Sequence, residues 1–187
     1  MKPSNRQLQN QFVALLRGIN VGGHHKVPMD KLKKLMTDLG FQNVVTLLNS
    51  GNAIFETSQT DIPKMEKLLS EKLMQHFGFP IPVILVDAKE IFELLKLDPF
   101  QKIKLTKDTR LYVSFLKVSP KTKLTFPWIS EDNSFQILGI KNKSIFSVLD
   151  LSISKSPKVM EALELMFGKE MTTRNWQTVL KIAEKIQ

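Results

Sequence analysis

The stretch LLRGINVGG, residues 15–23, is where a short apolar run meets a glycine-rich turn. Glycine in regular structure costs roughly 0.5–1 kcal/mol per residue, and it is favoured where the backbone needs a positive φ or a close approach to a ligand. The glycines within residues 18–23 therefore predict a turn with a specific backbone path. This turn is the first candidate binding site, with Arg17 at the strand end and Asn20 inside the turn.

The elements around this turn predict a first ferredoxin-like unit at residues 11–87. Short apolar runs bounded by turn residues predict strands, and apolar residues three and four apart predict helices. Pro28 and Asp61 suit helix starts, whereas Gly40 and Gly78 suit helix ends. The order is β-α-β-β-α-β, which is typical of a ferredoxin-like sheet covered by two helices. The predicted elements are strands at 11–16, 44–48, 52–56 and 82–86, and helices at 28–39 and 61–77.

The pattern partly repeats after a linker, residues 88–110, that contains a predicted helix at 88–97. The second unit, residues 111–187, is predicted as β-α-β-β-α followed by a C-terminal helix, with residues 120–129 either irregular or helical. Thr172 or Thr173 is the predicted N-cap of that last helix, which places Arg174 in its first turn. The sequence thus predicts an α+β fold of two ferredoxin-like units with antiparallel sheets. The other predicted elements are strands at 111–116, 135–138 and 144–149 and a helix at 156–167.

Composition excludes several classes of protein. The 187 residues are 42% hydrophobic and 24% charged, as in ordinary globular proteins, and no apolar run approaches the roughly 20 residues of a membrane helix. Residues 1–10 form a polar leader without the apolar stretch of a secretion signal, so we expect a cytoplasmic protein without membrane contact. The absence of cysteine excludes disulfides. The three histidines make a poor metal set, and we predict no metal site.

The net charge of +9 is concentrated in one segment. Residues 101–158 hold 11 basic and 4 acidic side chains, whereas residues 1–100 hold 12 and 10. A basic segment attracts nucleic acid through counterion release, and Phe115, Phe126, Trp128 and Phe135 are its possible stacking residues. The alternative is a lysine-rich soluble face over an aromatic core.

The spacing of residues in this sequence does not match the familiar motifs for nucleotide binding, catalysis or RNA recognition. The loop at 18–23 is neither Gly-x-Gly-x-x-Gly nor a P-loop, so the sequence names no cofactor. Binding of an anion of unspecified kind by the loop stays a hypothesis. His24 and His25 have no acidic residue within the loop to orient them, and no nucleophile or base can be assigned. Whether the protein is an enzyme therefore stays open. Asn52 and Ile54 stand where an RNA-recognition fold would carry aromatic rings, so that stacking platform is missing.

Three segments carry a family resemblance: residues 15–23 (LLRGINVGG), residues 50–52 (SGN) and residues 172–181 (TTRNWQTVLK). The chain resembles the uncharacterised bacterial proteins grouped as domain of unknown function 1697, over residues 11–184. It departs from their pattern at Gln177, at residues 53–54 and around residues 147–156. The resemblance implies a two-part α+β fold, and the family offers no established activity.

We therefore expect a small anionic ligand, such as a nucleotide or phosphorylated metabolite, between the glycine-rich turn and the start of the last helix. A polar network that fixes the docking of two subdomains is the alternative for the same residues. A nucleic-acid-binding module using residues 101–158 is the second hypothesis, and the oligomeric state stays open. The candidate ligand-binding residues are Arg17, Gly18, Asn20, Gly22, Gly23, Ser50, Asn52, Thr173, Arg174 and Asn175.

Overall fold

The computed structural model describes residues 10–186, which form two compact α+β units. The first unit takes in the chain up to Ile91 and the C-terminal residues from Ile182, and the second unit is Phe92–Lys181. The predicted leader, residues 1–10, lies outside the described residues except for Asn10, which begins the first strand.

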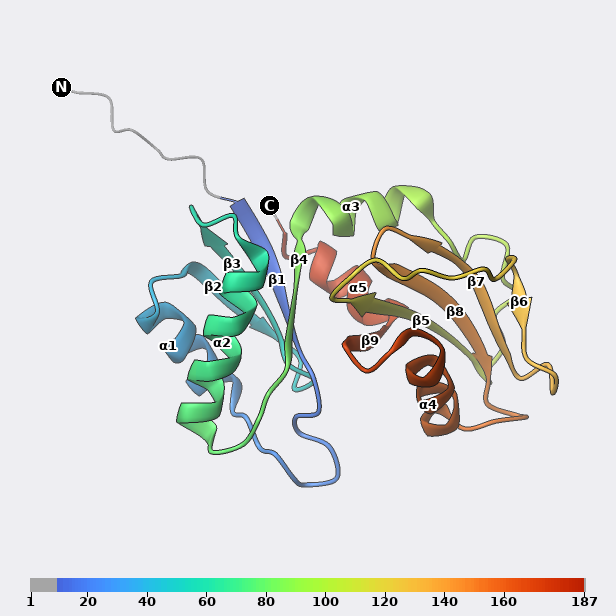
Figure 1. Cartoon of the computed structure of the whole chain (residues 1–187), viewed down its shortest axis with the longest axis horizontal. Helices are drawn as coiled ribbons and strands as arrows, with labels where there is room; N and C mark the ends of the chain where they lie inside the picture. The colour runs from blue at the N-terminus through green and yellow to red at the C-terminus, as the bar shows by residue number, and fades with distance from the viewer. Residues whose placement is uncertain (1–9, 187) are drawn as a thin grey trace. The chain divides into compact units, whose positions relative to one another are not determined.

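The first unit is a four-stranded antiparallel sheet in the order β2-β3-β1-β4, with α1 and α2 on one face (Figure 1). Both helices bury their apolar residues against the same cluster as the inward side of β1, which includes Phe12, Ala14 and Leu16. The element order is that of the predicted β-α-β-β-α-β unit. Its elements are β1 (Asn10–Leu16), α1 (Met29–Asp38), β2 (Gln42–Leu47), β3 (Asn52–Thr57), α2 (Ile62–Phe77) and β4 (Val83–Asp87).

Local sequence explains the bounds of α2. Asp61 caps its start, because the Asp61 carboxylate accepts a hydrogen bond from the Lys64 amide at 3.0 Å. Gly78 ends the helix in the left-handed conformation with φ of 83°. Within α2, the buried Glu66 points toward the edge of the sheet, where Glu66 Oε1 accepts the amide hydrogen of Leu85 at 2.9 Å. That amide belongs to β4, the last strand of the sheet on this side.

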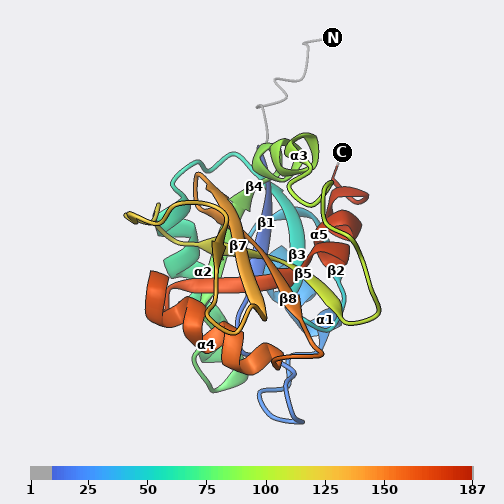
Figure 2. The same ribbon diagram turned by 90° about the vertical axis from the view of Figure 1, so that its right-hand side faces the viewer.

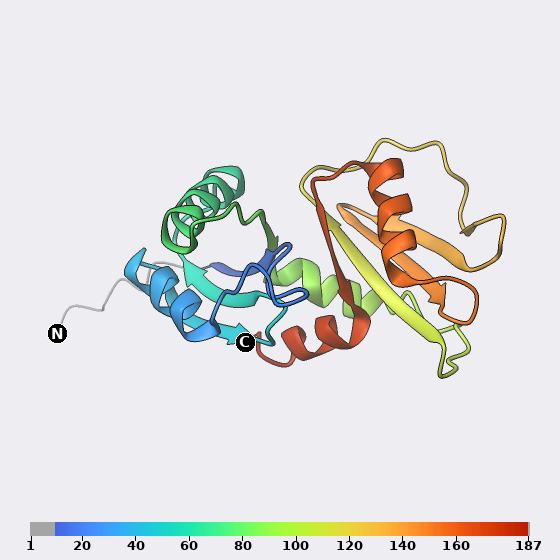
Figure 3. The ribbon, with the colours of Figure 1, turned by 90° about the horizontal axis from the view of Figure 1, so that it is seen from below.

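The second unit is a five-stranded antiparallel sheet in the order β6-β7-β8-β5-β9, and its strands β7 and β8 are seen along their length in Figure 2. Helix α4 lies on one face of this sheet (Figure 3), and its Val159 and Leu163 belong to the hydrophobic core of the unit. Counted within each unit, the long strands lie in the order second, third, first and fourth in both sheets. The predicted α+β fold of two units with antiparallel sheets is confirmed, and the described part of the second unit has no helix between its first and second long strands. The elements are β5 (Thr109–Leu116), β6 (Trp128–Ile129), β7 (Phe135–Lys141), β8 (Ser144–Asp150), α4 (Ser156–Phe167), β9 (Met171–Asn175) and α5 (Trp176–Ala183).

The helix α3 (Ala88–Leu97) begins in the first unit and continues into the second. The chain that follows α3 is anchored by Phe100, which is buried and packs edge-on against Phe146 and Trp176. Residues 101–108 therefore follow directly after Phe100, whose ring is fixed in the core of the second unit.

Two predictions for the second unit are settled by the structure. Between β5 and β7 the described chain is irregular with the short strand β6, so a helix at 120–129 is excluded. The predicted helix start at Thr172 or Thr173 is wrong, because residues 171–175 form β9 and α5 begins at Trp176. β9 pairs with β5, whose sequence is far away along the chain, and β-branched threonines suit that pairing. The cap is Asn175 instead, whose Oδ1 accepts from the Gln177 amide at 2.9 Å.

Candidate functional site

Residues 17–28 link β1 to α1 and form the glycine-rich loop of the first unit, drawn in blue in Figure 1. At its tip Val21 and His24 form a single antiparallel bridge, with the His24 amide 3.1 Å from Val21 O. A Cβ on Gly18 or Gly23 would meet nothing within 4 Å, so conformation rather than crowding selects glycine there. The positive-φ residues of the loop are Gly18 (72°), Asn20 (55°), Gly22 (59°), Gly23 (80°) and His25 (50°).

Asn20 holds the loop closed with both ends of its amide group. Asn20 Oδ1 accepts the amide hydrogen of Val27 at 2.9 Å, and Nδ2 donates to Val27 O at 3.1 Å. The same Nδ2 donates to Asn49 O at 2.7 Å, which joins the loop to the turn between β2 and β3. Asn20 therefore stabilises the loop, and both polar atoms of its side chain already make hydrogen bonds within the protein.

The turn between β2 and β3 is fixed in a similar way. Asn52 is fully buried, and its Nδ2 donates to Leu47 O at 2.8 Å and to Ser50 Oγ at 3.0 Å. Gly51 has φ of 76° and lies so close to the loop that a Cβ would stand 2.6 Å from Ile19 Cδ1 and 2.9 Å from Leu16 Cβ. Glycine is thus required at residue 51 by both conformation and space.

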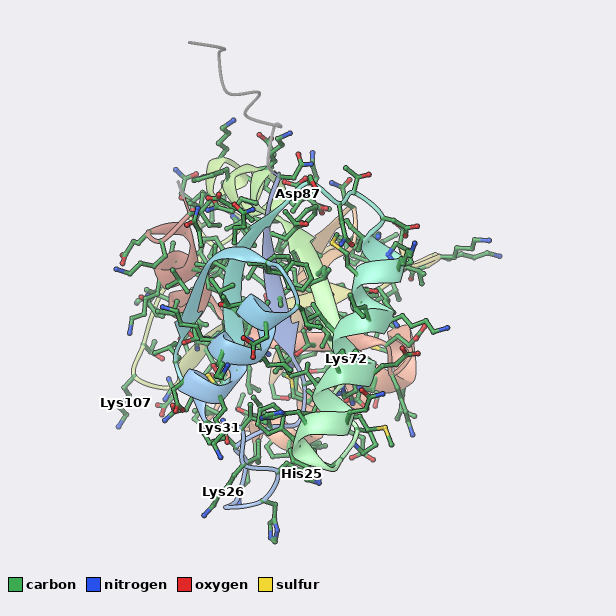
Figure 4. All side chains as sticks on the ribbon, turned by 90° about the vertical axis from the view of Figure 1, so that its left-hand side faces the viewer. His25, Lys26, Lys31, Lys72, Asp87 and Lys107 are labelled. Carbon is green, nitrogen blue, oxygen red and sulfur yellow. The ribbon has the colours of Figure 1, made fainter. Side chains whose placement is uncertain are left out.

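A groove of about 370 Å³ lies between these two turns and the start of α1. Lys26 is the cation among its lining residues, and Figure 4 shows Lys26 at the end of the unit where the loop projects. Pro28 is the N-cap residue of α1 and supplies no side-chain acceptor for the first-turn amides. Those amides carry the positive end of the helix dipole, which favours an anion. The lining residues are Asn20, Gly23, Lys26, Val27, Pro28 and Asn49.

Arg17, predicted as an anion ligand, is half-buried directly after β1. Its amide donates to Pro82 O at 3.0 Å, so the backbone at Arg17 is tied to the chain that enters β4. The residue therefore connects the loop to the edge of the sheet.

His25 is exposed, but its ring contacts two other residues of the first unit (Figure 4). Its ring stacks on Phe79 with centroids 4.5 Å apart and planes 21° apart, and Nδ1 lies 3.2 Å from Gly18 O. Because a carbonyl oxygen only accepts, Nδ1 is the donor in this contact. Sequence reasoning looked for an acidic residue within the loop and so missed a backbone carbonyl and a ring far along the chain.

The other predicted site residues, Thr173, Arg174 and Asn175, belong to the second unit. Arg174 is not in a helix: it lies in β9 with 8% of its surface exposed, and Nη1 donates to Thr172 Oγ1 at 2.8 Å and to Thr173 O at 3.0 Å. Burial lowers the pKa of the Arg174 guanidinium to about 10, which still leaves it charged at neutral pH. Thr173 Oγ1 is 2.7 Å from Ser114 Oγ on the neighbouring strand. The Thr173 and Arg174 side chains therefore make hydrogen bonds within the sheet of the second unit.

The basic segment, residues 101–158, mixes core and surface. Phe115 and Phe135, predicted as possible stacking residues, are 2% exposed and belong to the core, whereas Phe126 is 39% exposed. The acidic Asp132 stands in a tight turn: hydrogen bonds from the Ser134 and Ser130 hydroxyls and the Ser134 amide hold the pKa of its carboxyl well below 3.8. Within residues 10–186, no three His, Asp or Glu side chains gather as a metal site would require.

Comparison with known proteins places the chain in a family. Residues 9–146 match the family model described as Protein of unknown function (DUF1697). The chain belongs to this family. No curated protein matches the DUF1697 chain. Its fold is similar to a solved structure, that of the conserved bacterial protein SP0830 from Streptococcus pneumoniae, with 23% identity, a TM-score of 0.68 and coverage of 96% of this chain and 100% of that one. None of the described helices has the length and apolar character needed to cross a membrane.

Proposed function

We propose that this DUF1697 protein binds a small anionic ligand, a nucleotide or another phosphorylated metabolite, in the groove beside its glycine-rich loop. The observation that carries the proposal is that Lys26 and Pro28, the N-cap residue of α1, line one groove of about 370 Å³. An ammonium group favours a phosphate, and the N-terminus of a helix that begins beside the groove favours one as well.

The loop is fixed before a ligand arrives. Asn20 holds Val27 from both its amide and its carbonyl, and it also holds Asn49 across the groove. A site whose backbone is already ordered loses less conformational entropy on binding, so a small number of contacts to the ligand gives useful affinity. Asn20, Ser50, Gly51 and Asn52 thus support the site, whereas Lys26 and the amides near Gly23 and Pro28 contact the ligand.

The test is a thermal-shift and calorimetric comparison with inorganic phosphate, nucleotides, coenzyme A and sugar phosphates at fixed salt. A ligand at 100 times its Kd adds about 2.7 kcal/mol, which raises the melting temperature by roughly 5–10 °C for a chain of this length. The variant Lys26→Ala removes one charge-assisted hydrogen bond, worth about 1.5–3 kcal/mol, and should weaken binding by roughly 10- to 100-fold.

Lys33→Ala is the matched control, because Lys33 is an exposed lysine on α1 that does not line the groove. It carries the same loss of charge and should change the affinity by less than about twofold. Equal weakening by both variants would mean that the ligand responds to overall charge. Failure of every anion to shift the melting temperature would also contradict the proposal.

A further inference from the structure

The second unit contains a different groove, of about 240 Å³, lined mainly by polar side chains. One wall is the chain between α3 and β5, and the other is formed by the ends of β7 and β8. All of its residues lie within Phe92–Lys181, so the groove belongs to the second unit alone. The polar residues that matter for a ligand are Lys102, Lys104, Thr109, Asn133, Gln136 and Asp150.

The lysine wall is held in place at both ends. Before it, Phe100 is buried in the core, and Phe100 O accepts the Ile103 amide at 2.9 Å. After it, the hydroxyl of Thr109 accepts the Thr106 amide at 3.0 Å, and Asp108 O accepts the Leu151 amide at 2.9 Å. The short segment that carries Lys102 and Lys104 therefore has little freedom to move away from the groove.

The opposite wall is held by the turn at residues 130–134. Asp132 Oδ1 accepts hydrogen bonds from Ser130 Oγ and from Ser134 N and Oγ, which fixes Asn133 at the tip of the turn with φ of 56°. Asp150 is fixed in a similar way, since its Oδ1 accepts from Ser152 N at 2.9 Å and Ser152 Oγ at 2.6 Å. These bonds from Ser152 lower the pKa of the Asp150 carboxyl and keep it ionised.

The polar groups of this groove are available to a ligand. Among the residues that the structure describes, neither Lys102 nor Lys104 has an ion-pair partner, and the side chains of Asn133 and Gln136 make no hydrogen bond. Asp150 directs only Oδ1 to Ser152, which leaves Oδ2 as an acceptor. The groove thus offers two cations, two amide groups and one carboxylate oxygen in one place.

We infer that this groove binds a ribonucleotide unit, with Lys102 and Lys104 on the phosphate, Asp150 on a ribose hydroxyl and the amides of Asn133 and Gln136 on the base. A carboxylate accepts ribose hydroxyls well, as in dinucleotide sites, and it repels a phosphate, so the two ends of the ligand are distinguished. Asn and Gln amides match the donor and acceptor edge of adenine. At about 240 Å³ the groove lies just below the roughly 300–1,000 Å³ that small-molecule pockets usually span, so its size suits no more than a single nucleotide unit.

A ribonucleotide unit can come from a free nucleotide or from a single strand of RNA, and the experiment separates the two. The probes are adenosine 5′-monophosphate, its 2′-deoxy form, and fluorescein-labelled octamers of riboadenylate and deoxyriboadenylate, each titrated into the full chain. We expect a ribo form to bind at least threefold more tightly than its deoxy form. Binding of the octamer but not of the monophosphate assigns the strand as the source, and the reverse assigns the free nucleotide.

The double variant Lys102→Gln/Lys104→Gln should weaken the bound probe at least tenfold. Its matched control is Lys121→Gln/Lys123→Gln, which removes the same charge at the same spacing from exposed lysines of the same basic segment outside the groove. The control should change the affinity by less than twofold. The groove double variant should also reduce the salt dependence of binding, since fewer counterions are released.

Asp150→Asn keeps an oxygen for Ser152 and removes the charge, so it should abolish the preference for ribose and leave deoxyadenosine monophosphate within about twofold. The melting temperature of each variant shows that the fold is retained. Equal weakening by the two lysine pairs, equal binding of ribo and deoxy forms to the wild type, or no binding of any probe at 1 mM would each overturn the inference. Each titration is repeated in the Lys26→Ala background, which removes the binding proposed beside the glycine-rich loop, and the loss caused by Lys102→Gln/Lys104→Gln should persist there. This inference therefore stands or falls separately from the proposed function.

Discussion

The two grooves differ in what their polar side chains already do. Beside the glycine-rich loop, Asn20 makes three hydrogen bonds within the protein, and the neighbouring Asn52 is fully buried in a hairpin turn. In the groove of the second unit, Asn133 has nearly the same φ as Asn20, 56° against 55°, but its side-chain amide makes no hydrogen bond with the described residues. A dense motif of polar residues can therefore be engaged within the protein, while an inconspicuous lysine-rich segment borders a groove with unengaged amide side chains.

The largest effect should come from Gly51, which joins the two turns of the first groove. Gly51→Ala places a Cβ 2.6 Å from Ile19 Cδ1 at a positive φ, and we expect a loss of about 2–4 kcal/mol in the free energy of unfolding. Gly139→Ala in β7 is the control, because a Cβ there meets nothing within 4 Å, and it should change stability by less than about 1 kcal/mol. Urea unfolding measures both. Similar losses at the two positions would show that the crowding at Gly51 relaxes.

Asn20→Asp should come next. The substitution keeps the acceptor for the Val27 amide but loses the donor to Val27 O and Asn49 O, which should cost about 1–3 kcal/mol. Asn133→Asp tests the other groove with the same chemical change at nearly the same φ, and it should change the free energy of unfolding by less than about 0.5 kcal/mol. Urea denaturation at neutral pH compares the pair directly. Equal effects would remove the distinction between engaged and unengaged side chains.

Two buried serines of the second sheet extend the comparison to hydroxyl groups. Ser114 Oγ is 2.7 Å from Thr173 Oγ1, whereas Ser147 Oγ is buried without a hydrogen-bond partner among the described residues. Ser114→Ala should cost about 1 kcal/mol, and Ser147→Ala should be neutral or stabilise by up to about 0.5 kcal/mol. Thermal unfolding of both variants checks the order. A clear loss at Ser147 would indicate a partner such as a bound water.

The smallest effect should be at Asp132, and it should depend on pH. The hydrogen bonds from Ser134 and Ser130 lower the pKa of its carboxyl in the folded state, so the stabilisation is complete above the ordinary value of 3.8 and is lost progressively as pH falls below it. Wild type should melt above Asp132→Asn at pH 7, and the gap should close between pH 4 and the most acidic conditions that the fold survives. A gap that widens on acidification would have the wrong sign.

Local signals predicted the elements that depend on neighbouring residues. Asp61 and Gly78 mark the ends of α2 because capping uses residues close in the chain. β9 was mispredicted as a helix because Thr173 suits an N-cap equally well, and only pairing with the distant β5 decides in favour of a strand. Tertiary pairing overrides local propensity in such short segments.

The site was harder to predict than the fold. The three glycines and Asn20 marked the loop correctly, but their type alone did not show that Asn20 is engaged by Val27 and Asn49. The stacking of His25 on Phe79 and the groove at Lys102 both join segments that no local pattern connects. Binding groups presented by separate segments are visible only once the chain is folded.

The buried carboxylate of Glu66 has a consequence for self-association. Edge strands invite pairing with strands of other chains, since their outward amides and carbonyls are unpaired. At the middle of β4, Glu66 Oε1 already occupies the outward amide of Leu85. A foreign strand would have to displace a buried carboxylate before it could extend the sheet on this side. The Glu66 contact therefore opposes aggregation through β4. It favours β2, the strand at the other edge, as the place where a foreign strand would extend the sheet.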